Sequence, residues 1–129
     1  MAAKRVLIVD DDRDFLGELK DTLQLSGYVV DMVSEAGKVI DFVSHNRPDV
    51  ILLDMKLGGM TGFELAKRLR CSPDTARIPV IAMSGYFNED NDCTLFDFFQ
   101  IKQCLQKPFN PLDIISQIES LDNDADTTT

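Results

Sequence analysis

The chain has 129 residues, enough for one domain with its own core but too few for two. Its formal net charge of −9 argues against nucleic-acid binding by this segment. It has no apolar run long enough to cross a membrane and no signal-peptide pattern, and its three cysteines are scattered, so we expect a cytoplasmic protein with reduced thiols.

Segments typical of strands and segments typical of helices alternate along the chain. Short apolar runs predict strands, and apolar residues three or four apart predict helices. In chain order we expect a strand at 5–9, a helix at 15–23, a strand at 28–33, a helix at 34–43, a strand at 50–54, a helix at 61–69, a strand at 79–83, a helix at 95–101, a short strand at 104–106 and a helix at 110–121. Residues 1–121 are expected to form the domain, and the polar residues 122–129 a disordered tail.

Polar residues and glycines indicate where several of these elements begin and end. Gly27 is placed to stop the first helix. Asp31 interrupts the apolar residues of the second strand, which is typical of an edge strand with one wet face. Thr61, with Glu64 three residues later, has the pattern of a capping box, and Asn110 before a proline indicates the start of the last helix.

This alternation predicts an α/β fold in which a doubly wound, five-stranded parallel sheet has helices on both faces. The expected strand order is 2-1-3-4-5, as in flavodoxin-like folds. The third strand ends on Asp54 after four apolar residues, so we expect it at the buried centre of the sheet, followed by a loop at 57–60. In this order, five polar residues at or just after strand ends converge on one edge of the sheet: Asp10, Asp11, Asp54, Ser84 and Lys107.

These residue types permit chemistry on a phosphoryl group. Three carboxylates in one pocket repel each other unless a hard cation such as Mg²⁺ lies among them. A carboxylate can attack phosphorus to form an aspartyl phosphate, while a lysine neutralises phosphoryl oxygens and a serine hydroxyl donates a hydrogen bond to them. Each residue alone has a simpler interpretation, as part of a solvated acidic face, a helix cap or a surface lysine, so the hypothesis depends on their conjunction.

Four motifs, in this order, resemble those of the receiver domain of two-component response regulators, which is CheY-like. The motifs are VLIVDDD at 6–12, VILLDM at 50–55, IAMSG at 81–85 and KPF at 107–109. The resemblance extends over residues 5–121. It implies a phosphorylation-dependent signalling switch, which is not a conventional enzyme.

By this resemblance, Asp54 matches the phospho-acceptor. It would take its phosphoryl group from a phosphohistidine on a sensor histidine kinase or a phosphotransfer protein. Asp10 and Asp11 match the acidic pair that holds Mg²⁺ in the family, with Asp11 as a direct ligand. The metal would also bind Asp54 and the backbone carbonyl of Lys56.

Two further residues match the part of the family's site that responds to phosphorylation. Ser84 matches the switch hydroxyl, and Lys107 matches the family's lysine, whose peptide bond to the following proline is commonly cis. The family usually has an aromatic residue three positions before that lysine, where this chain has Cys104. An output domain or partner would read the response at the face of the fourth helix, fifth strand and fifth helix, where Tyr86 or Phe96 could replace the missing aromatic ring.

Other interpretations stay open at this point. In a haloacid-dehalogenase-like phosphatase, Asp10 would be the nucleophile, but little chain follows Lys107 to supply a second acidic pair, and Asp54 would have no role. A degenerate receiver would bind partners without being phosphorylated. A flavin-binding relative of flavodoxin is disfavoured because the segment after the first strand is acidic. The chain can be a stand-alone receiver or part of a longer regulator, and no motif identifies its kinase or output.

Overall fold

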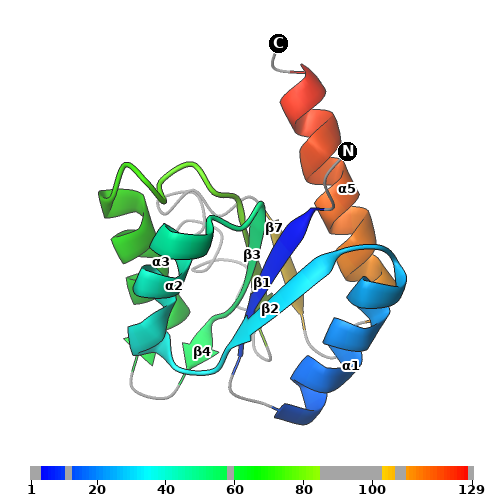
Figure 1. Cartoon of the computed structure of the whole chain (residues 1–129), viewed down its shortest axis with the longest axis horizontal. Coiled ribbons are helices and arrows are strands. Elements are labelled where there is room, and N and C mark those ends of the chain that lie inside the picture. Colours follow the sequence, from blue (N-terminus) through cyan, green and yellow to red (C-terminus); the bar gives the residue numbers. More distant parts are fainter. Residues whose placement is uncertain (1–3, 11–12, 58–59, 85–102, 107–109, 128–129) are drawn as a thin grey trace.

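The computed structural model describes residues 4–10, 13–57, 60–84, 103–106 and 110–127. Its main feature is a five-stranded parallel sheet in the order β2-β1-β3-β6-β7 (Figure 1). The strands are β1 (Arg5–Val9), β2 (Val29–Val33), β3 (Val50–Asp54), β6 (Val80–Ser84) and β7 (Gln103–Gln106). Neighbouring strands in this sheet all pair in parallel, so the predicted α/β class and the order 2-1-3-4-5 are confirmed.

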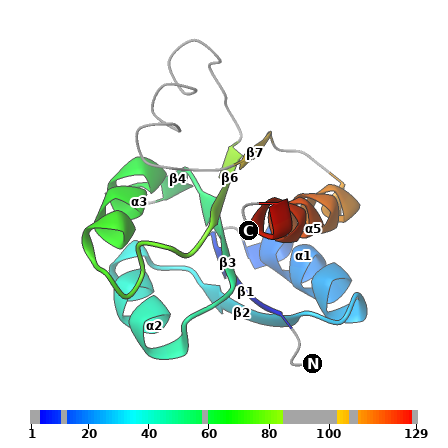
Figure 2. The ribbon, with the colours of Figure 1, turned by 90° about the horizontal axis from the view of Figure 1, so that it is seen from above.

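Helices cover both faces of this sheet (Figure 2). The described helices are α1 (Arg13–Leu25), α2 (Val39–Asn46), α3 (Gly62–Cys71) and α5 (Pro111–Thr127), and a 3₁₀ turn, η1 (Ala36–Lys38), leads into α2. The helices α2 and α3 lie on one face, and α1 and α5 lie on the other, as a doubly wound fold requires. None of the described helices is long and apolar enough to cross a membrane.

The buried residues form one apolar cluster on each face of the sheet. In β1, Leu7 and Val9 belong to the cluster under α2 and α3, whereas Val6 and Ile8 belong to the cluster under α1 and α5. This alternation follows from the two-residue period of a strand. The helices contribute Val39, Val43, Leu65, Ala66 and Leu69 to the first cluster, and Leu16, Leu19, Leu23, Ile114 and Ile118 to the second. Every residue of β3 is buried, so the prediction of a central strand is confirmed.

The ends of several elements have the residues that the sequence analysis expected. Gly27 follows α1 with a φ of 96°, a left-handed conformation that glycine adopts without the steric cost of a side chain. The Oδ1 atom of Asn110 accepts a hydrogen bond from the backbone N–H of Leu112 at 3.0 Å, which caps the start of α5. Thr61 immediately precedes the first residue of α3, the position expected of its cap.

Three predicted segments differ from the observed structure. Residues 57–60 are not a plain loop, because β4 (Lys56–Leu57) and β5 (Met60–Thr61) pair as a short antiparallel hairpin. The helix expected from residue 34 begins as the turn η1, and Glu35 at its cap makes no side-chain hydrogen bond there. Helix α5 runs past residue 121 to Thr127, while the division into a domain and a tail at that residue stays a prediction. The predicted helix at 95–101, with Phe96, lies outside the described residues, as do Tyr86 and Cys93.

Two side chains, Thr75 and Arg70, hold the connection between α3 and β6 by donating hydrogen bonds to backbone carbonyls. Thr75 is fully buried, and its hydroxyl donates a hydrogen bond to the carbonyl of Leu69 at 2.5 Å. The Nη1 atom of Arg70 donates to the carbonyls of Ala76 and Ile78 at 2.8 and 3.0 Å. Burial lowers the pKa of Arg70 from its ordinary value. These bonds satisfy backbone groups that the turn would otherwise leave without partners.

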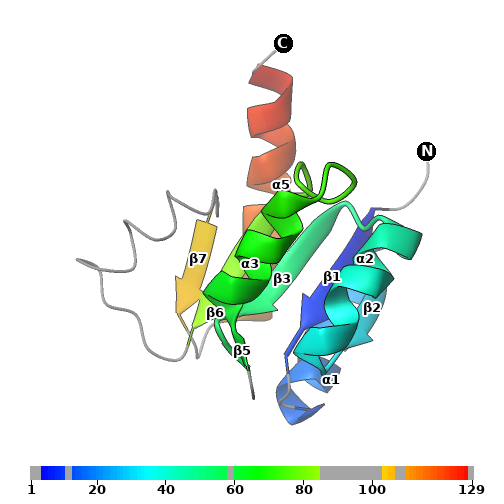
Figure 3. The same ribbon diagram turned by 90° about the vertical axis from the view of Figure 1, so that its left-hand side faces the viewer.

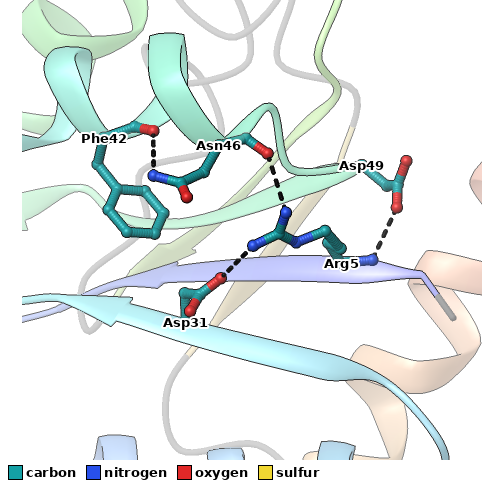
Figure 4. Close-up of polar contacts among 5 residues, drawn as sticks. All are labelled: Arg5, Asp31, Phe42, Asn46 and Asp49. Atoms are coloured by element: carbon teal, nitrogen blue, oxygen red, sulfur yellow. Dashed lines mark hydrogen bonds and ion pairs between the residues drawn. The ribbon is translucent and has the colours of Figure 1, made fainter.

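Polar contacts around Arg5 tie together the edge of the sheet at which the strands begin (Figure 4). Its backbone N–H donates to Oδ2 of Asp49 at 2.7 Å, and its guanidinium donates to Oδ2 of Asp31 at 3.3 Å and to the carbonyl of Asn46 at 3.4 Å. The amide of Asn46 in turn donates to the carbonyl of Phe42 at 2.9 Å. The expectation that β2 is an edge strand is confirmed by its place at one end of the strand order, and Asp31 at its centre is half-buried.

We expect Arg5→Met to destabilise the fold by about 1 kcal/mol, because it keeps the apolar stem but removes the bonds to Asp31 and Asn46. The magnitude is small because the Arg5 and Asp31 side chains are 43% and 37% exposed. Urea unfolding measures the loss. The matched control is Lys38→Met, which removes a more exposed ion pair and should change stability by less than about 0.5 kcal/mol. Equal effects of the two changes would contradict a structural role for Arg5.

Candidate functional site

Two acidic residues lie at the ends of adjacent strands in the middle of the sheet. Val9 of β1 is the register partner of Leu53 of β3. Asp10 directly follows Val9, and Asp54 directly follows Leu53 as the last residue of β3. Asp10 is fully buried and Asp54 is 5% exposed. The sequence prediction that these two carboxylates come together at the carboxyl edge of the sheet is thus supported by the positions of both residues.

Backbone hydrogen bonds fix Asp10 just after β1 and Asp54 at the last position of β3. The N–H of Asp10 donates to the carbonyl of Val33 at 3.3 Å, which extends the pairing of β1 with β2. The N–H of Met55 donates to the carbonyl of Met83 at 3.0 Å, which extends the pairing of β3 with β6. Burying a carboxylate disfavours its ionised form unless hydrogen bonds or a cation compensate. Two buried carboxylates on neighbouring strands therefore form an electrostatic arrangement suited to a cation.

The hairpin after Asp54 orients the backbone of Lys56. The N–H of Gly62 donates to the carbonyl of Met55 at 3.0 Å, and the next pair along the hairpin is Lys56 with Thr61. In an antiparallel ladder, hydrogen-bonded and non-hydrogen-bonded pairs alternate. Lys56 and Thr61 are therefore a non-hydrogen-bonded pair, and the carbonyl of Lys56 points away from β5. That carbonyl oxygen is consequently available to a ligand outside the hairpin.

Gly62 is a residue of this site that the sequence analysis missed. A Cβ atom at this position would lie 2.5 Å from Cα of Met55 and 2.9 Å from the carbonyl oxygen of Asp54. The first turn of α3 thus packs directly on the backbone that carries Asp54, and only a residue without a side chain allows that approach. The one signal in the sequence was a glycine at a helical position, where it is less favourable than alanine.

The other predicted site residues are described in part. Ser84 ends β6 at the same edge of the sheet, with Gln106 of β7 as its register partner. Lys107 is the residue after Gln106 in the sequence, but it lies outside the described residues, as does Asp11. Among the residues that the structure describes, no three His, Cys, Asp or Glu side chains gather at one point. The predicted metal site takes one of its ligands from the undescribed Asp11 and another from a backbone carbonyl.

Solved structures with the same architecture define the class of protein. A CheY-like response regulator receiver domain protein from Methanospirillum hungatei JF-1 is 27% identical, with a TM-score of 0.87 over 99% of this chain and 100% of that one. Chemotaxis protein CheY4 from Vibrio cholerae is 26% identical, with a TM-score of 0.86 over 92% of this chain and 98% of that one. The fold is therefore the flavodoxin-like fold of CheY.

Residues 6–119 match the family model of the response regulator receiver domain, and the chain belongs to that family. It is 29% identical over 121 residues to the phosphate regulon transcriptional regulatory protein PhoB of Pseudomonas aeruginosa, covering 94% of this chain and 52% of that protein. Response regulator MprA of a Mycobacterium species is 31% identical over 81 residues, 63% of this chain and 34% of that protein. The chain thus spans about half the length, or less, of these curated relatives.

Membership of this family excludes two of the interpretations that the sequence left open. The chain is a receiver domain of two-component signalling, and not a haloacid-dehalogenase-like phosphatase or a flavodoxin that binds flavin. Its family is one of signalling proteins. Proteins of this family act with histidine kinases and output domains, as the receiver domain of a signal transduction histidine kinase from Syntrophus aciditrophicus, 28% identical, illustrates.

Proposed function

We propose that this receiver domain is a phosphorylation-dependent switch in which Asp54 is the phospho-acceptor. The observation that carries this proposal is the burial of Asp54 beside Asp10 at the carboxyl edge of the sheet. The phosphoryl donor is a phosphohistidine on a sensor histidine kinase or a phosphotransfer protein in the cytoplasm. An oxygen of the Asp54 carboxylate attacks phosphorus, the bond from phosphorus to the histidine nitrogen breaks, and the nitrogen keeps its electron pair.

The residues at this edge fit a magnesium site. Asp10, Asp11 and Asp54 offer carboxylate oxygens, and the carbonyl of Lys56 adds a backbone oxygen, which are the hard ligands that Mg²⁺ prefers. The fit is supported by the two buried carboxylates and by the outward direction of the Lys56 carbonyl. A bound Mg²⁺ would supply positive charge to the oxygens of the transferred group. The pairing of β4 with β5 and the close packing of Gly62 hold the backbone part of this ligand set in place.

Two more residues complete the proposed site. Lys107 would neutralise the phosphoryl oxygens as a point charge, and the hydroxyl of Ser84 would donate a hydrogen bond to them. The support for Ser84 is the position of its backbone at the end of β6, next to β3. We place the output surface on the face that includes β7 and α5, where Cys104 stands in place of the family's usual aromatic residue. A partner or an output domain would bind this face.

Incubation with acetyl phosphate and Mg²⁺, followed by intact-mass measurement, tests the proposal. We expect a gain of one phosphoryl group per chain, because a receiver domain supplies the groups that assist transfer from a small-molecule donor. Removal of Mg²⁺ with a chelator should prevent the gain. A wild-type chain that gains no mass with Mg²⁺ present would instead indicate a degenerate receiver that binds partners without phosphorylation.

Mg²⁺ alone is expected to raise the melting temperature. A ligand that binds only the folded state stabilises it by RT ln(1 + [L]/Kd), about 1.4 kcal/mol at ten times Kd, which corresponds to roughly 5 °C for a chain of this size. Differential scanning fluorimetry with and without millimolar Mg²⁺ measures the shift. Asp11→Ala should remove it, while Asp41→Ala, at an exposed position of α2, should leave it unchanged. An equal shift in both variants would contradict the site.

A further inference from the structure

A groove runs between the helices on one face of the sheet, and neither Asp10 nor Asp54 is among its lining residues. It has a volume of about 570 Å³ and lies between the start of α2, with η1, and the length of α3. The helices α2 and α3 lie side by side on this face (Figure 3). Ala36 is buried and Ile40 is half-buried, so they form an apolar floor. A groove of this size holds a short peptide or a small molecule.

One stripe of α3 forms the opposite wall. Leu65, Ala66 and Leu69 form the buried face of this helix, and a second set of residues at helical spacing lies beside them on the exposed flank. This second set lines the groove and consists of Glu64, Lys67, Arg68 and Cys71. The wall therefore presents two bases, one carboxylate and a thiol above an apolar floor.

The two bases of this wall differ from the other basic residues on the same face. Lys38 and Arg47 form ion pairs with carboxylates of this chain, at 3.4 and 3.8 Å, and the guanidinium of Arg70 donates to backbone carbonyls. Within the part of the chain that the structure describes, neither Lys67 nor Arg68 forms an ion pair. Lys67 and Arg68 are adjacent exposed cations, and Glu64 is the one carboxylate among the groove's lining residues, so these residues carry a net positive charge.

The distribution of charge over the chain indicates what the groove would attract. The net charge is −9, and α5 on the opposite face has five acidic residues and no basic one: Asp113, Glu119, Asp122, Asp124 and Asp126. An acidic ligand is repelled by that face and attracted to the pair Lys67 and Arg68. A nucleic acid carries far more negative charge than two cations can pair, so the field of this acidic molecule opposes it more strongly than it opposes a short acidic segment.

We propose that this groove binds an acidic segment of a partner protein. One aliphatic side chain of the segment packs on the floor of Ala36 and Ile40, and carboxylates on either side of it pair with Lys67 and Arg68. Apolar anchoring gives the contact area, and the paired charges orient the segment along α3. The site does not include the acidic pair at the edge of the sheet, so it can be tested without phosphorylation.

The probe for this site is the peptide acetyl-Glu-Glu-Leu-Glu-Glu-amide. Its binding is measured from the changes that it causes in the backbone amide chemical shifts of the full chain. We expect shifts in residues 36–40 and 64–71 that saturate at about 1 mM peptide or below, the affinity of a weak, specific contact. The peptide with glutamine in place of glutamate should bind about tenfold more weakly, because both ion pairs are lost. Shifts on α1 or α5 instead, or equal binding of the two peptides, would overturn the proposal.

Matched variants test the two cations directly. Lys67→Gln with Arg68→Gln should weaken binding about tenfold, whereas Lys20→Gln with Arg77→Gln, which removes the same charge outside the groove, should weaken it by about twofold at most. Lys67, Arg68 and Arg77 are exposed and Lys20 is half-buried, so all variants should fold. The thiol of Cys71 gives an independent readout, because it is exposed on the wall. The acidic peptide should slow its alkylation by maleimide, measured by peptide mapping, and an unchanged rate at saturating peptide would count against occupancy of the groove.

Discussion

Asp54→Asn is expected to remove all phosphorylation of this chain by acetyl phosphate. The amide has nearly the shape of the carboxylate but lacks the oxygen nucleophile that attacks phosphorus. Because Asp54 is 5% exposed, the substitution also removes a buried negative charge next to the fully buried Asp10. We expect the variant to fold, because the amide fills the same buried space as the carboxylate and keeps a hydrogen-bond acceptor. Intact-mass measurement and urea unfolding of the same preparation test both statements.

The control for this experiment is Asp41→Asn, at an exposed position of α2 on the same face as the groove. It changes the net charge by the same amount, and it should leave both the phosphorylation and the response to Mg²⁺ as they are in the wild type. If Asp54→Asn still gains a phosphoryl group and that group maps to Asp10, then Asp10 and not Asp54 is the acceptor. A large loss of stability would show that the Asp54 carboxylate makes contacts that the fold requires.

The thermal shift of Asp54→Asn in Mg²⁺, compared with that of the wild type, separates metal binding from phosphoryl transfer. Asp54→Asn should lose part of the thermal shift that Mg²⁺ gives to the wild type, because a carboxylate ligand becomes an amide. A variant that loses phosphorylation but keeps the full shift would show that the metal is held by the remaining oxygens. The two measurements therefore report on different parts of the proposed site.

The sheet and its acidic edge could be predicted because the signals are local and strong. The run before Asp54 is apolar at four successive positions, which leaves few alternatives to a buried central strand. Once five alternating strands and helices are assigned, a parallel sheet places the strand ends at one edge by geometry alone. The neighbouring positions of Asp10 and Asp54 follow from that topology without knowledge of any side-chain contact.

The features that were missed depend on contacts between distant parts of the chain. The bonds of Arg5 join it to residues 26 to 44 positions away, and no sequence pattern marks them. The strands β4 and β5 have two residues each, too few to show a period, so the two glycines between them indicated only a loop. The need for glycine at position 62 arises from the way α3 packs on β3, which only the three-dimensional structure shows.

Gly62→Ala is expected to destabilise the fold by about 2 kcal/mol, roughly 8 °C in melting temperature. The added methyl group would meet Cα of Met55 at 2.5 Å and the carbonyl oxygen of Asp54 at 2.9 Å. Both are backbone atoms, so relief requires α3 or the end of β3 to move. The loss outweighs the gain of about 1 kcal/mol that alanine normally brings to a helix.

The matched control is Gly17→Ala in the middle of α1. A methyl group there meets nothing within 4 Å, and the position is exposed, so the substitution should stabilise the protein by about 0.5–1 kcal/mol. The same chemical change is thus expected to have opposite signs at two helical glycines. Gly62→Ala should also weaken the thermal response to Mg²⁺, because a displaced α3 would disturb the hairpin that orients the Lys56 carbonyl. If Gly62→Ala instead stabilised the chain as Gly17→Ala does, the close packing of α3 on the Asp54 backbone would be wrong.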